Sequence, residues 1–537
     1  MSGGEGGLPA PTVLAPSRRE ALDRVGGAGR AGRDLLGSVL GHALSRPGHL
    51  ALRDSTVSLT YAQLGEAVQR VAAGLAGAGV RQGDRVALAI GNSAPFVTTA
   101  LGCLWLGAVF VPTAPDGPPA RLARVIADCK PTVLVTSDDQ VPDLEGCQVP
   151  TLSYAQLATA TGPVPPRDVE AARDAYIIYT SGTTGAPKGV TIPQEAIAWS
   201  SATTARLLGL TPSTRTMAVS PFYFDGAFGP VFATLFAGGY LLVPKREDLL
   251  FLRPFFDLLL REEINVTSFT PSYLRLLLAS RHAHKLSQSK LKVVALGGEQ
   301  CLAQDVARLW QLLPGARVFN RYGPTEATVA VTSYNVTQGD VSAGAVPLGT
   351  PHPGVEFFIF AEDGSLVEEA GCQGELYISG RQLMSRYWGD EALTRSVLRR
   401  DLVRGRVLYK TGDLVYRDEQ GRYFYRGRLD DVVKRNGVRI SLSEVAGALH
   451  HAGPLEGVCC ALYDQGGAPG IAAFVEPGQG AELSRSVLVE GASSELPANA
   501  LPDEIFVVKG FPLTQQGKVD RDRLLRDVGL APWSERS

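Results

Sequence analysis

A glycine- and hydroxyl-rich segment carries the clearest chemical signal in the sequence. Tyr179-Thr-Ser-Gly-Thr-Thr-Gly-Ala-Pro-Lys-Gly189 follows the apolar stretch Ala175-Tyr-Ile-Ile178. Glycines let a backbone approach an anion closely, and hydroxyls together with a lysine can hold phosphate oxygens. The spacing differs from GxxxxGK[ST], because Gly189 stands where a Ser or Thr would ligate magnesium. The segment therefore predicts a phosphate-binding loop outside the Walker class, with an ordinary polar surface loop as the alternative.

Further motifs occur along the chain in a fixed order. They are Leu59-Thr-Tyr-Ala-Gln-Leu64, Leu106-Gly-Ala-Val-Phe-Val-Pro112, Asn320-Arg-Tyr-Gly-Pro-Thr-Glu326, Tyr409-Lys-Thr-Gly-Asp413, Gly427-Arg-Leu-Asp430 and Pro512-Leu-Thr-Gln-Gln-Gly-Lys-Val-Asp-Arg521. Together with the loop they resemble the adenylate-forming (ANL) superfamily, which includes acyl-CoA synthetases, luciferases and the adenylation domains of nonribosomal peptide synthetases. The resemblance covers nearly the whole chain after Asp34.

The resemblance implies a two-step reaction with ATP and Mg²⁺. A carboxylate attacks the α-phosphorus of ATP to give an acyl-AMP and pyrophosphate, and a thiol then takes the acyl group. Negative charge spreads over the phosphoryl oxygens in the transition state, so cations and oriented N–H groups are needed there. The alternative from a different class is a nucleotide-binding regulator that adenylates nothing, but such a protein would have no need of both Glu326 and Lys518.

The resemblance assigns a role to each matched motif. Residues 180–188 would hold the β- and γ-phosphates, and Glu326 would ligate Mg²⁺, a hard ion that prefers oxygen. Tyr322 would lie against the adenine, and Asp413 would bind the ribose hydroxyls. The predicted catalytic residues are Lys518, Thr180, Lys188 and Glu326. The predicted nucleotide-binding residues are Thr180, Ser181, Gly182, Thr183, Thr184, Gly185, Lys188, Gly297, Gly298, Glu299, Asn320, Tyr322, Gly323, Thr325, Asp413 and Arg428.

Two positions near the end of the chain carry the expected conformational change. Lys518 would bridge the reacting carboxylate and the charge that develops on the phosphate. Asp430 falls at the hinge of the family, about which a small domain would swing so that residues 431–440 face the thiol. Taken singly, Tyr322 could be a core residue, Asp413 a turn residue and Lys518 an exposed lysine.

The family's substrate pocket maps mostly onto small or apolar residues, with three charged exceptions, Asp225, Arg321 and Lys518. The positions are Phe224, Asp225, Gly226, Gly229, Ser272, Val294, Leu296, Arg321, Val329, Ala330 and Lys518. In the amino-acid branch an aspartate at the place of Asp225 pairs with the substrate ammonium. A carboxylate in the apolar segment Phe222–Phe228 needs a partner, unless Asp225 caps a helix instead.

Arg321 is the second exception. A guanidinium matches a carboxylate bidentately, so an amino acid with a second carboxylate would satisfy both Asp225 and Arg321. Aspartate, 3-methylaspartate and glutamate fit, with either the α- or the side-chain carboxylate activated. The alternative is that Arg321 pairs with a carboxylate of the protein and has no bearing on the substrate.

The segment Phe224–Pro230 also resembles the stand-alone β-amino-acid ligases of macrolactam polyketide biosynthesis, of the vicenistatin type that activates 3-methylaspartate. An aromatic residue often occupies the place of Gly229 in peptide synthetases. No carrier-protein serine motif or condensation-domain motif occurs, so the expected acceptor is a separate carrier protein with a phosphopantetheine thiol, in natural-product biosynthesis. Adenylation of a neutral α- or β-amino acid, or a fatty- or aryl-acid:CoA ligase, remains the alternative.

The elements that must position these residues alternate between strand and helix. Residues 86–90, 131–135 and 293–296 read as buried strands, and 61–78 and 119–129 as amphipathic helices. Such alternation predicts layers of α/β structure. After Gly374 the pattern becomes strand- and turn-rich up to Gly427. We expect an ANL fold: a flexible arm (1–34), a large α/β domain with a β-rich subdomain (35–429) and a small mobile α+β domain (430–537).

Composition excludes several other classes of protein. The 537 residues carry 52 basic and 54 acidic side chains, so nothing indicates binding to nucleic acid or to an acidic membrane surface. No apolar run is long enough for a membrane span, and the first residues lack a signal-peptide core. Seven cysteines without a CxxC motif are typical of a reducing compartment. We therefore expect a cytoplasmic enzyme.

Overall fold

The computed structural model describes most of the chain. The described residues are 34–116, 119–137, 148–167, 173–181, 187–429, 432–435, 438–465, 469–478, 483–493, 496, 500–514 and 518–533. The predicted arm, residues Gly182 to Gly185 of the loop and Asp430 thus lie outside them, apart from Asp34. No helix among these residues is long and apolar enough to cross a membrane.

The first sheet has seven strands within the described ranges, and its centre is parallel. In spatial order they are β17 (Arg386–Tyr387), β8 (Pro187–Pro193), β7 (Asp174–Ser181), β4 (Val109–Pro112), β3 (Arg85–Ala89), β5 (Val133–Thr136) and β6 (Thr151–Ser153). β7 and β8 pair antiparallel, as do β8 and β17. This edge brings a segment near residue 387 against the strand that carries Lys188.

The second sheet has eight strands among the residues described. Their spatial order is β14 (Thr332–Asn335), β13 (Arg317–Tyr322), β12 (Val293–Gly297), β11 (Val266–Phe269), β9 (Arg215–Met217), β10 (Tyr240–Leu242), β1 (Leu50–Arg53) and β2 (Ser58–Thr60). The run from β1 to β13 is parallel, and β14 returns antiparallel along β13 with Arg321 opposite Ser333.

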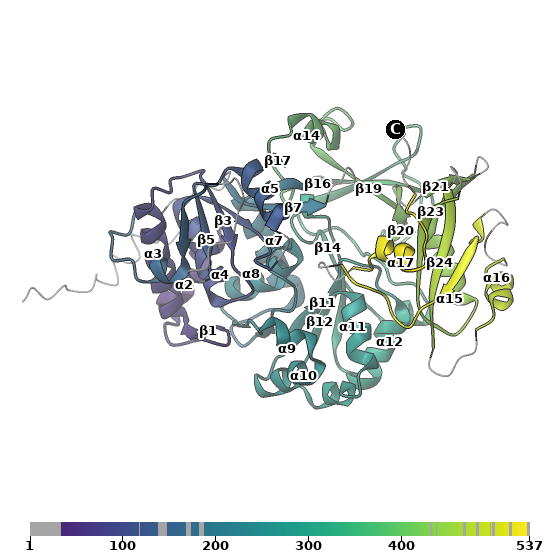
Figure 1. Cartoon of the computed structure of the whole chain (residues 1–537), viewed down its shortest axis with the longest axis horizontal. Coiled ribbons are helices and arrows are strands. Elements are labelled where there is room, and N and C mark those ends of the chain that lie inside the picture. The colour runs from purple at the N-terminus through teal and green to yellow at the C-terminus, as the bar shows by residue number, and fades with distance from the viewer. Residues whose placement is uncertain are drawn as a thin grey trace, which may run out of the picture.

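Helices cover these sheets and lie between them (Figure 1). They are α2 (Leu35–Ser45), α3 (Tyr61–Gly77), α4 (Ala94–Leu106), α5 (Pro119–Cys129), α6 (Tyr154–Ala158), α7 (Gln194–Leu208), α8 (Phe228–Phe236), α9 (Arg246–Leu250), α10 (Leu252–Arg261), α11 (Pro271–Ala279), α12 (Ala303–Leu312), α13 (Gln338–Ser342) and α14 (Glu391–Val397), with 3₁₀ turns η1 (Asp225–Ala227), η2 (Ala283–Gln288) and η3 (Thr325–Ala327). The largest apolar cluster includes Phe96 of α4, Phe228 and Phe232 of α8, Leu88 of the first sheet and Leu241 of the second. Burial of α4 and α8 therefore joins the two sheets into one body.

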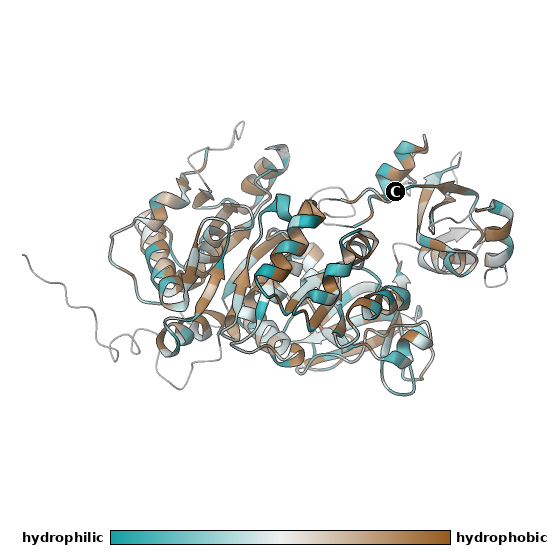
Figure 2. Cartoon of the chain, turned by 90° about the horizontal axis from the view of Figure 1, so that it is seen from below, coloured by the Kyte–Doolittle hydropathy of each residue, from teal (hydrophilic) through white to brown (hydrophobic). Residues whose placement is uncertain are grey.

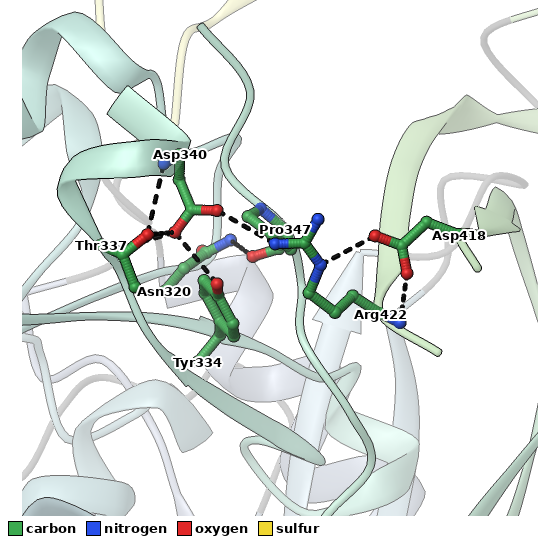
Figure 3. Close-up of polar contacts among 7 residues, drawn as sticks. All are labelled: Asn320, Tyr334, Thr337, Asp340, Pro347, Asp418 and Arg422. Carbon is green, nitrogen blue, oxygen red and sulfur yellow. Dashed lines mark hydrogen bonds and ion pairs between the residues drawn. The ribbon is translucent and has the colours of Figure 1, made fainter. Parts of the chain in front are cut away.

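A β-rich unit follows the second sheet. It contains β15 (Val355–Phe360), β16 (Gln373–Gly380), β18 (Leu398–Arg399), β19 (Leu408–Arg417) and β20 (Tyr423–Arg428). Arg422, in the β19–β20 turn, bridges Asp340 of α13 and Asp418 (Figure 3). Asp340 in turn accepts hydrogen bonds from Thr337 and Tyr334. These contacts tie the unit to the end of the second sheet.

The elements after β20 gather at one end of the molecule (Figures 1 and 2). They are the hairpin β21 (Val432–Arg435) and β22 (Val438–Ser441), the sheet β23 (Leu455–Asp464), β24 (Pro469–Pro477) and β25 (Glu504–Val507), and α15 (Leu442–His451), α16 (Arg485–Ser493) and α17 (Arg521–Asp527). This sheet has one apolar cluster against α15 and α16 and another against α17. The predicted boundary at 429/430 falls between β20 and β21 and stays a prediction.

The predicted elements match the structure closely. The helix expected over 61–78 is α3, whose N-terminus is capped by Thr60 together with Gln63. The strand expected over 131–135 begins two residues later, at Val133 of β5. Pro131 has no N–H to donate to a sheet, which accounts for the later start.

Candidate active site

The antiparallel pair β7–β8 places Thr180 opposite Lys188 at the end of the first sheet. The Thr180 hydroxyl is buried and has no hydrogen-bond partner among the described residues. A buried hydroxyl without a partner is costly, so this atom is suited to a ligand oxygen. Nothing is described of the side chain of Ser181 or of residues 182–186, including Thr183 and Thr184.

Glu326 and Lys188 meet at the hydroxyl of Tyr387. Tyr387 donates to Glu326 Oε1 at 2.7 Å, and Lys188 Nζ donates to the Tyr387 hydroxyl at 3.2 Å. The lysine nitrogen lies 3.8 Å from the same carboxylate oxygen. Burial raises the pKa of Tyr387, and the Glu326 charge adds to that effect. No sequence motif singles out Tyr387, because only the pairing of β17 with β8 brings it here.

A second group joins Tyr322, Asp413 and Arg428. The Tyr322 hydroxyl donates to Asp413 Oδ2, and Arg428 Nη1 donates to Asp413 Oδ1 at 3.2 Å. Burial raises the pKa of Asp413, while Arg428 acts in the opposite direction. A buried carboxylate with both charged and neutral donors is held in one orientation, which suits the predicted role of Asp413 as a ligand for ribose hydroxyls.

The backbone around Tyr322 admits only glycine at two predicted positions. A Cβ on Gly323 would lie 2.5 Å from Ala330 Cα, and one on Gly297 would lie 2.9 Å from the carbonyl oxygen of Arg321. Gly298 follows with a positive φ of 84°. Asn320 is buried, and its Nδ2 donates to the carbonyl of Pro347 at 2.7 Å (Figure 3). Asn320 therefore holds the end of β13 in place.

Glu299 and Ser272 contact each other rather than standing apart. The Ser272 hydroxyl and backbone N–H both donate to Glu299 Oε2, at 2.6 and 2.9 Å. Glu299 Oε1 is buried without a hydrogen-bond partner among the residues described. Ser272, predicted to line the substrate pocket, thus orients a residue predicted to bind the nucleotide.

Asp225 is enclosed by protein yet keeps some accessible surface, and the neighbouring Gly226 is exposed, with open space where a Cβ would stand. Burial raises the pKa of Asp225 to about 6; a hydrogen bond with Thr325 and the nearby Lys518 lower it, and Glu326 raises it. The helix-cap alternative is wrong, because Phe224 precedes η1, Ala227 precedes α8, and neither start has a side-chain cap.

Arg321 is buried at the end of β13, with 6% of its surface accessible. Its Nη2 donates to Thr204 Oγ1 at 2.9 Å and its Nε donates to Ser333 Oγ at 3.3 Å. Burial lowers its pKa to about 10, and no carboxylate among the described residues offsets that burial. The alternative in which Arg321 pairs with a protein carboxylate is therefore not what the described structure contains.

Gly229 explains how the guanidinium fits. A Cβ at Gly229 would lie 2.9 Å from Arg321 Nη1 and 2.9 Å from Val329 Cγ1. Three predicted pocket residues are thus in direct contact, and the missing side chain at 229 makes room for Arg321. Val329 has a positive φ of 72°, a strained conformation for a β-branched residue.

The other predicted pocket positions differ in their setting. Val294 and Leu296 of β12 are completely buried in the apolar cluster of the second sheet. Ala330 is buried beside Val329, and Phe224 lies against Tyr223 with ring centroids 4.5 Å apart.

Lys518 reaches this site from the other end of the chain. Leu513 and Val519 form an isolated bridge, and the Thr514 N–H donates to the Lys518 carbonyl at 2.7 Å. The Lys518 side chain is exposed, yet its charge acts on both Asp225 and Asp413. Residues predicted for nucleotide, for substrate and for catalysis are therefore gathered around one site.

Comparison with known proteins identifies the family of the chain. The family model described as "AMP-binding enzyme" matches residues 41–388. The chain belongs to the AMP-binding enzyme family. It is an AMP-forming ligase with the adenylate-forming fold. The fold class predicted from the sequence is confirmed.

Individual relatives place this AMP-binding enzyme beside peptide synthetases. It is 31% identical to the isonitrile lipopeptide synthase of Streptomyces coeruleorubidus over 97% of the chain, but it spans only 36% of that synthase. It is 28% identical to the D-alanine–D-alanyl carrier protein ligase of Bacillus licheniformis, over 92% of the chain and 99% of that ligase. A four-domain nonribosomal peptide synthetase, AB3403, solved with AMP and glycine, superposes with a TM-score of 0.79 at 28% identity, over 96% of the chain and 38% of the synthetase.

Proposed function

We propose that this enzyme activates an amino acid that carries a second carboxylate and transfers it to the phosphopantetheine thiol of a separate carrier protein. Aspartate, 3-methylaspartate and glutamate are the candidate substrates, as in the β-amino-acid ligases that the sequence resembles. The observation that carries the proposal is Arg321, a buried cation without a carboxylate partner among the described residues. An isolated buried charge is retained at a cost in stability, which a bound anion offsets.

Asp225 supplies the second half of the recognition. It is a carboxylate with a pKa raised by burial, and the neighbouring Gly226 has open space where a Cβ would stand. An ammonium group beside it would restore its ionised form, because a close opposite charge lowers the pKa of a carboxyl group. A substrate with one ammonium and two carboxylates leaves one carboxylate for Arg321 and one for reaction. The carrier-protein partner is supported by the name of the full-length relative, a carrier protein ligase.

The described side chains suggest how the first step proceeds. A carboxylate oxygen of the substrate attacks the α-phosphorus, and the bond to the pyrophosphate oxygen breaks. Lys518 would neutralise the charge shared by the two reacting groups, and Lys188 and Thr180 would hold the pyrophosphate oxygens. In the second step the thiol attacks the acyl carbon and AMP leaves.

The donor set also fits Mg²⁺. The Glu326 carboxylate lies 3.8 Å from Nζ of Lys188, the residue opposite Thr180 in the β7–β8 pair. The charge of Glu326 also raises the pKa of Asp225, so a bound cation would reduce the repulsion between the two carboxylates. Mg²⁺ takes one or two protein carboxylates and completes its shell with phosphate oxygens and water. Bound there, it would neutralise charge on the phosphates of ATP.

The test is amino-acid-dependent ATP–pyrophosphate exchange with wild type and Arg321→Ala. The panel holds aspartate, 3-methylaspartate, glutamate, β-alanine, 3-aminobutyrate, neutral α-amino acids and fatty or aryl acids. We expect wild type to have its highest kcat/KM with acidic amino acids. In Arg321→Ala the kcat/KM for these substrates should fall on the order of 100-fold. Preference for neutral amino acids would overturn the acidic substrate, and exchange only with acids that lack an amine would overturn the role of Asp225 as well.

Two amides of aspartate identify the carboxylate that reacts. Asparagine retains the α-carboxylate, and isoasparagine retains the β-carboxylate. The amide that still supports exchange, with a raised KM, contains the reacting carboxylate, because the other group is the one that Arg321 binds. The kcat/KM of Arg321→Ala for aspartate should then be nearly equal to its kcat/KM for that amide.

A further inference from the structure

A chain of polar side chains lies behind Arg321 and does not belong to any predicted motif; His352 and Gln382 are buried, and Ser333 is half-buried. Arg321 Nε donates to Ser333 Oγ at 3.3 Å, and Ser333 Oγ lies 3.0 Å from His352 Nε2. His352 Nδ1 lies 3.3 Å from Gln382 Oε1. Gln382 Nε2 then donates to the carbonyls of Ala330 at 2.7 Å and of Thr328 at 3.2 Å.

The hydrogen bonds in this chain run in one direction. Since Gln382 Nε2 donates to the backbone carbonyls of Ala327, Thr328 and Ala330, its Oε1 faces His352 and can only accept. His352 therefore carries its hydrogen on Nδ1, and its Nε2 accepts from the Ser333 hydroxyl. The Ser333 oxygen is then left to accept from Arg321. Every member has a partner, and only a neutral His352 allows this sequence of donors.

The surroundings keep His352 neutral. Burial and the Arg321 charge lower its pKa to about 4; contacts with Gln382 and the Thr332 backbone oppose this, and Arg206 reinforces it. The residue is 2% accessible. A charged His352 would place a second cation beside Arg321, so at neutral pH the chain presents one positive charge and not two.

A separate hydroxyl completes the hold on the guanidinium. Thr204 of α7, fully buried, accepts from Arg321 Nη2 at 2.9 Å. Nε and Nη2 are thereby used within the protein. Nη1, next to Gly229, makes no hydrogen bond to a described residue and is not sealed off from solvent. The guanidinium is thus held along one edge, with Nη1 left at the pocket side.

We propose that Thr204, Ser333, His352 and Gln382 are positioning residues that set the selectivity of the enzyme for a substrate carboxylate over its amide. They fix the plane of Arg321, and Gln382 couples that plane to the strained turn that carries Val329 and Ala330 into the pocket. This inference rests on the proposed function, because it assumes that Arg321 binds a carboxylate of the substrate. Pre-organised donors bind an anion without an ordering penalty, so loosening them raises the KM for the acidic substrate.

The measurement is the ratio of kcat/KM for aspartate to that for its active amide, determined by pyrophosphate exchange. Thr204→Val keeps the shape of the side chain and removes the acceptor, and we expect the ratio to fall about 10-fold, through the KM for aspartate, with the KM for ATP unchanged. Thr204→Ser restores the hydroxyl and should remain within about twofold of wild type. Ser333→Ala is a second, independent variant with the same expected loss.

Ser201→Ala is the matched control. Ser201 lies on the same helix, is buried, and donates to the Ile197 carbonyl without contacting Arg321, so the ratio should not change. If wild type prefers aspartate but both Thr204→Val and Ser333→Ala keep the wild-type ratio, the positioning role is overturned and the proposed substrate stands. If wild type has no preference for aspartate over the amide, both proposals are overturned.

Discussion

Asp225 and Arg321 are two charged side chains that form no ion pair with another described residue. The carboxyl of Asp225 has a pKa raised by burial, and the guanidinium of Arg321 has one lowered by it. Shifts of this kind are typical of groups at ligand sites, and both residues are predicted to line the substrate pocket. Each charge therefore offers a test that separates binding from stability.

The first test is the pH dependence of amino-acid binding. Asp225 must be ionised to pair with an ammonium group, and its pKa in the free enzyme is about 6. We expect kcat/KM for the amino acid to fall about tenfold per pH unit below pH 6. Exchange with saturating ATP, measured from pH 5 to 9, shows this limb. Asp225→Asn should be much less active and lack the limb; a wild-type profile that stays level down to pH 5 would contradict the assignment.

The stability of the fold should change with pH in the opposite sense to kcat/KM. The folded-state pKa of Asp225 is raised above its ordinary value of 3.8, so the folded enzyme binds the proton more tightly, and stability is lost as pH rises from about 4 to 6. At pH 7 Asp225→Asn should increase the free energy of unfolding by roughly 1–3 kcal/mol. Urea unfolding at pH 7 and at pH 4 checks this, since the gain should vanish at the lower pH.

Arg321→Met should likewise lose activity without losing stability, and its effect on the free energy of unfolding should be the same at pH 4 and pH 7. The apolar side chain has a similar length and no charge, so removing an unpaired buried cation should leave stability unchanged or raise it by about 1–2 kcal/mol. Adenylation of acidic amino acids should fall on the order of 100-fold in the same variant. A large loss of stability would mean that Arg321 serves the fold. Arg317→Met, on the same strand, is a control for the loss of an arginine.

At the scale of elements, the short strand β17 joins two of the predicted catalytic residues, Lys188 and Glu326. It pairs with β8, so Tyr387 lies opposite Val190 in the strand of Lys188, and the Met384 N–H donates to the Glu326 carbonyl at 2.7 Å. One two-residue strand therefore sets both the lysine and the carboxylate.

Tyr387→Phe removes only the hydroxyl between them. We expect kcat for pyrophosphate exchange to fall about 10-fold, with a higher Mg²⁺ requirement, because Glu326 and Lys188 lose the group that orients them. Tyr377→Phe is the matched control, since the Tyr377 hydroxyl donates to a different carboxylate, Glu375, at 3.4 Å. Equal kinetics for both variants would rule out the orienting role of Tyr387.

At the scale of the whole molecule, the C-terminal elements bring Lys518 to a site made by the two large sheets. Contacts between these parts include the hydrogen bond of Gln304 in α12 with His450 in α15, at 2.7 Å. The charge of Lys518 acts on Asp225 and Asp413 in this arrangement. We propose that adenylation takes place with the C-terminal elements in this position, with Lys518 near Asp225 and Asp413.

Lys518→Ala should slow pyrophosphate exchange by roughly 100- to 1,000-fold, the usual effect of losing one donor to a developing charge. Transfer to the thiol from chemically supplied aminoacyl-AMP should persist, because the proposed hinge at Asp430 removes Lys518 before that step. Lys509→Ala, an exposed lysine in the same part of the chain, is the control. Equal loss in both half-reactions would contradict the swing of the small domain.

The amino-acid sequence by itself determined the family, the alternation of strands and helices, and the identity of most of the charged groups at the site. Local patterns suffice for this: the run at Val293–Gly297 is a buried strand, and ordered motifs contain the predicted nucleotide-binding residues. Tertiary structure alone decided that Asp225 caps no helix, that Gly229 makes room for Arg321, and that Tyr387 joins Lys188 to Glu326. It also brought Thr204, Ser333, His352 and Gln382 together. These residues come from separate elements, and packing of the sheets, not sequence spacing, sets their distances.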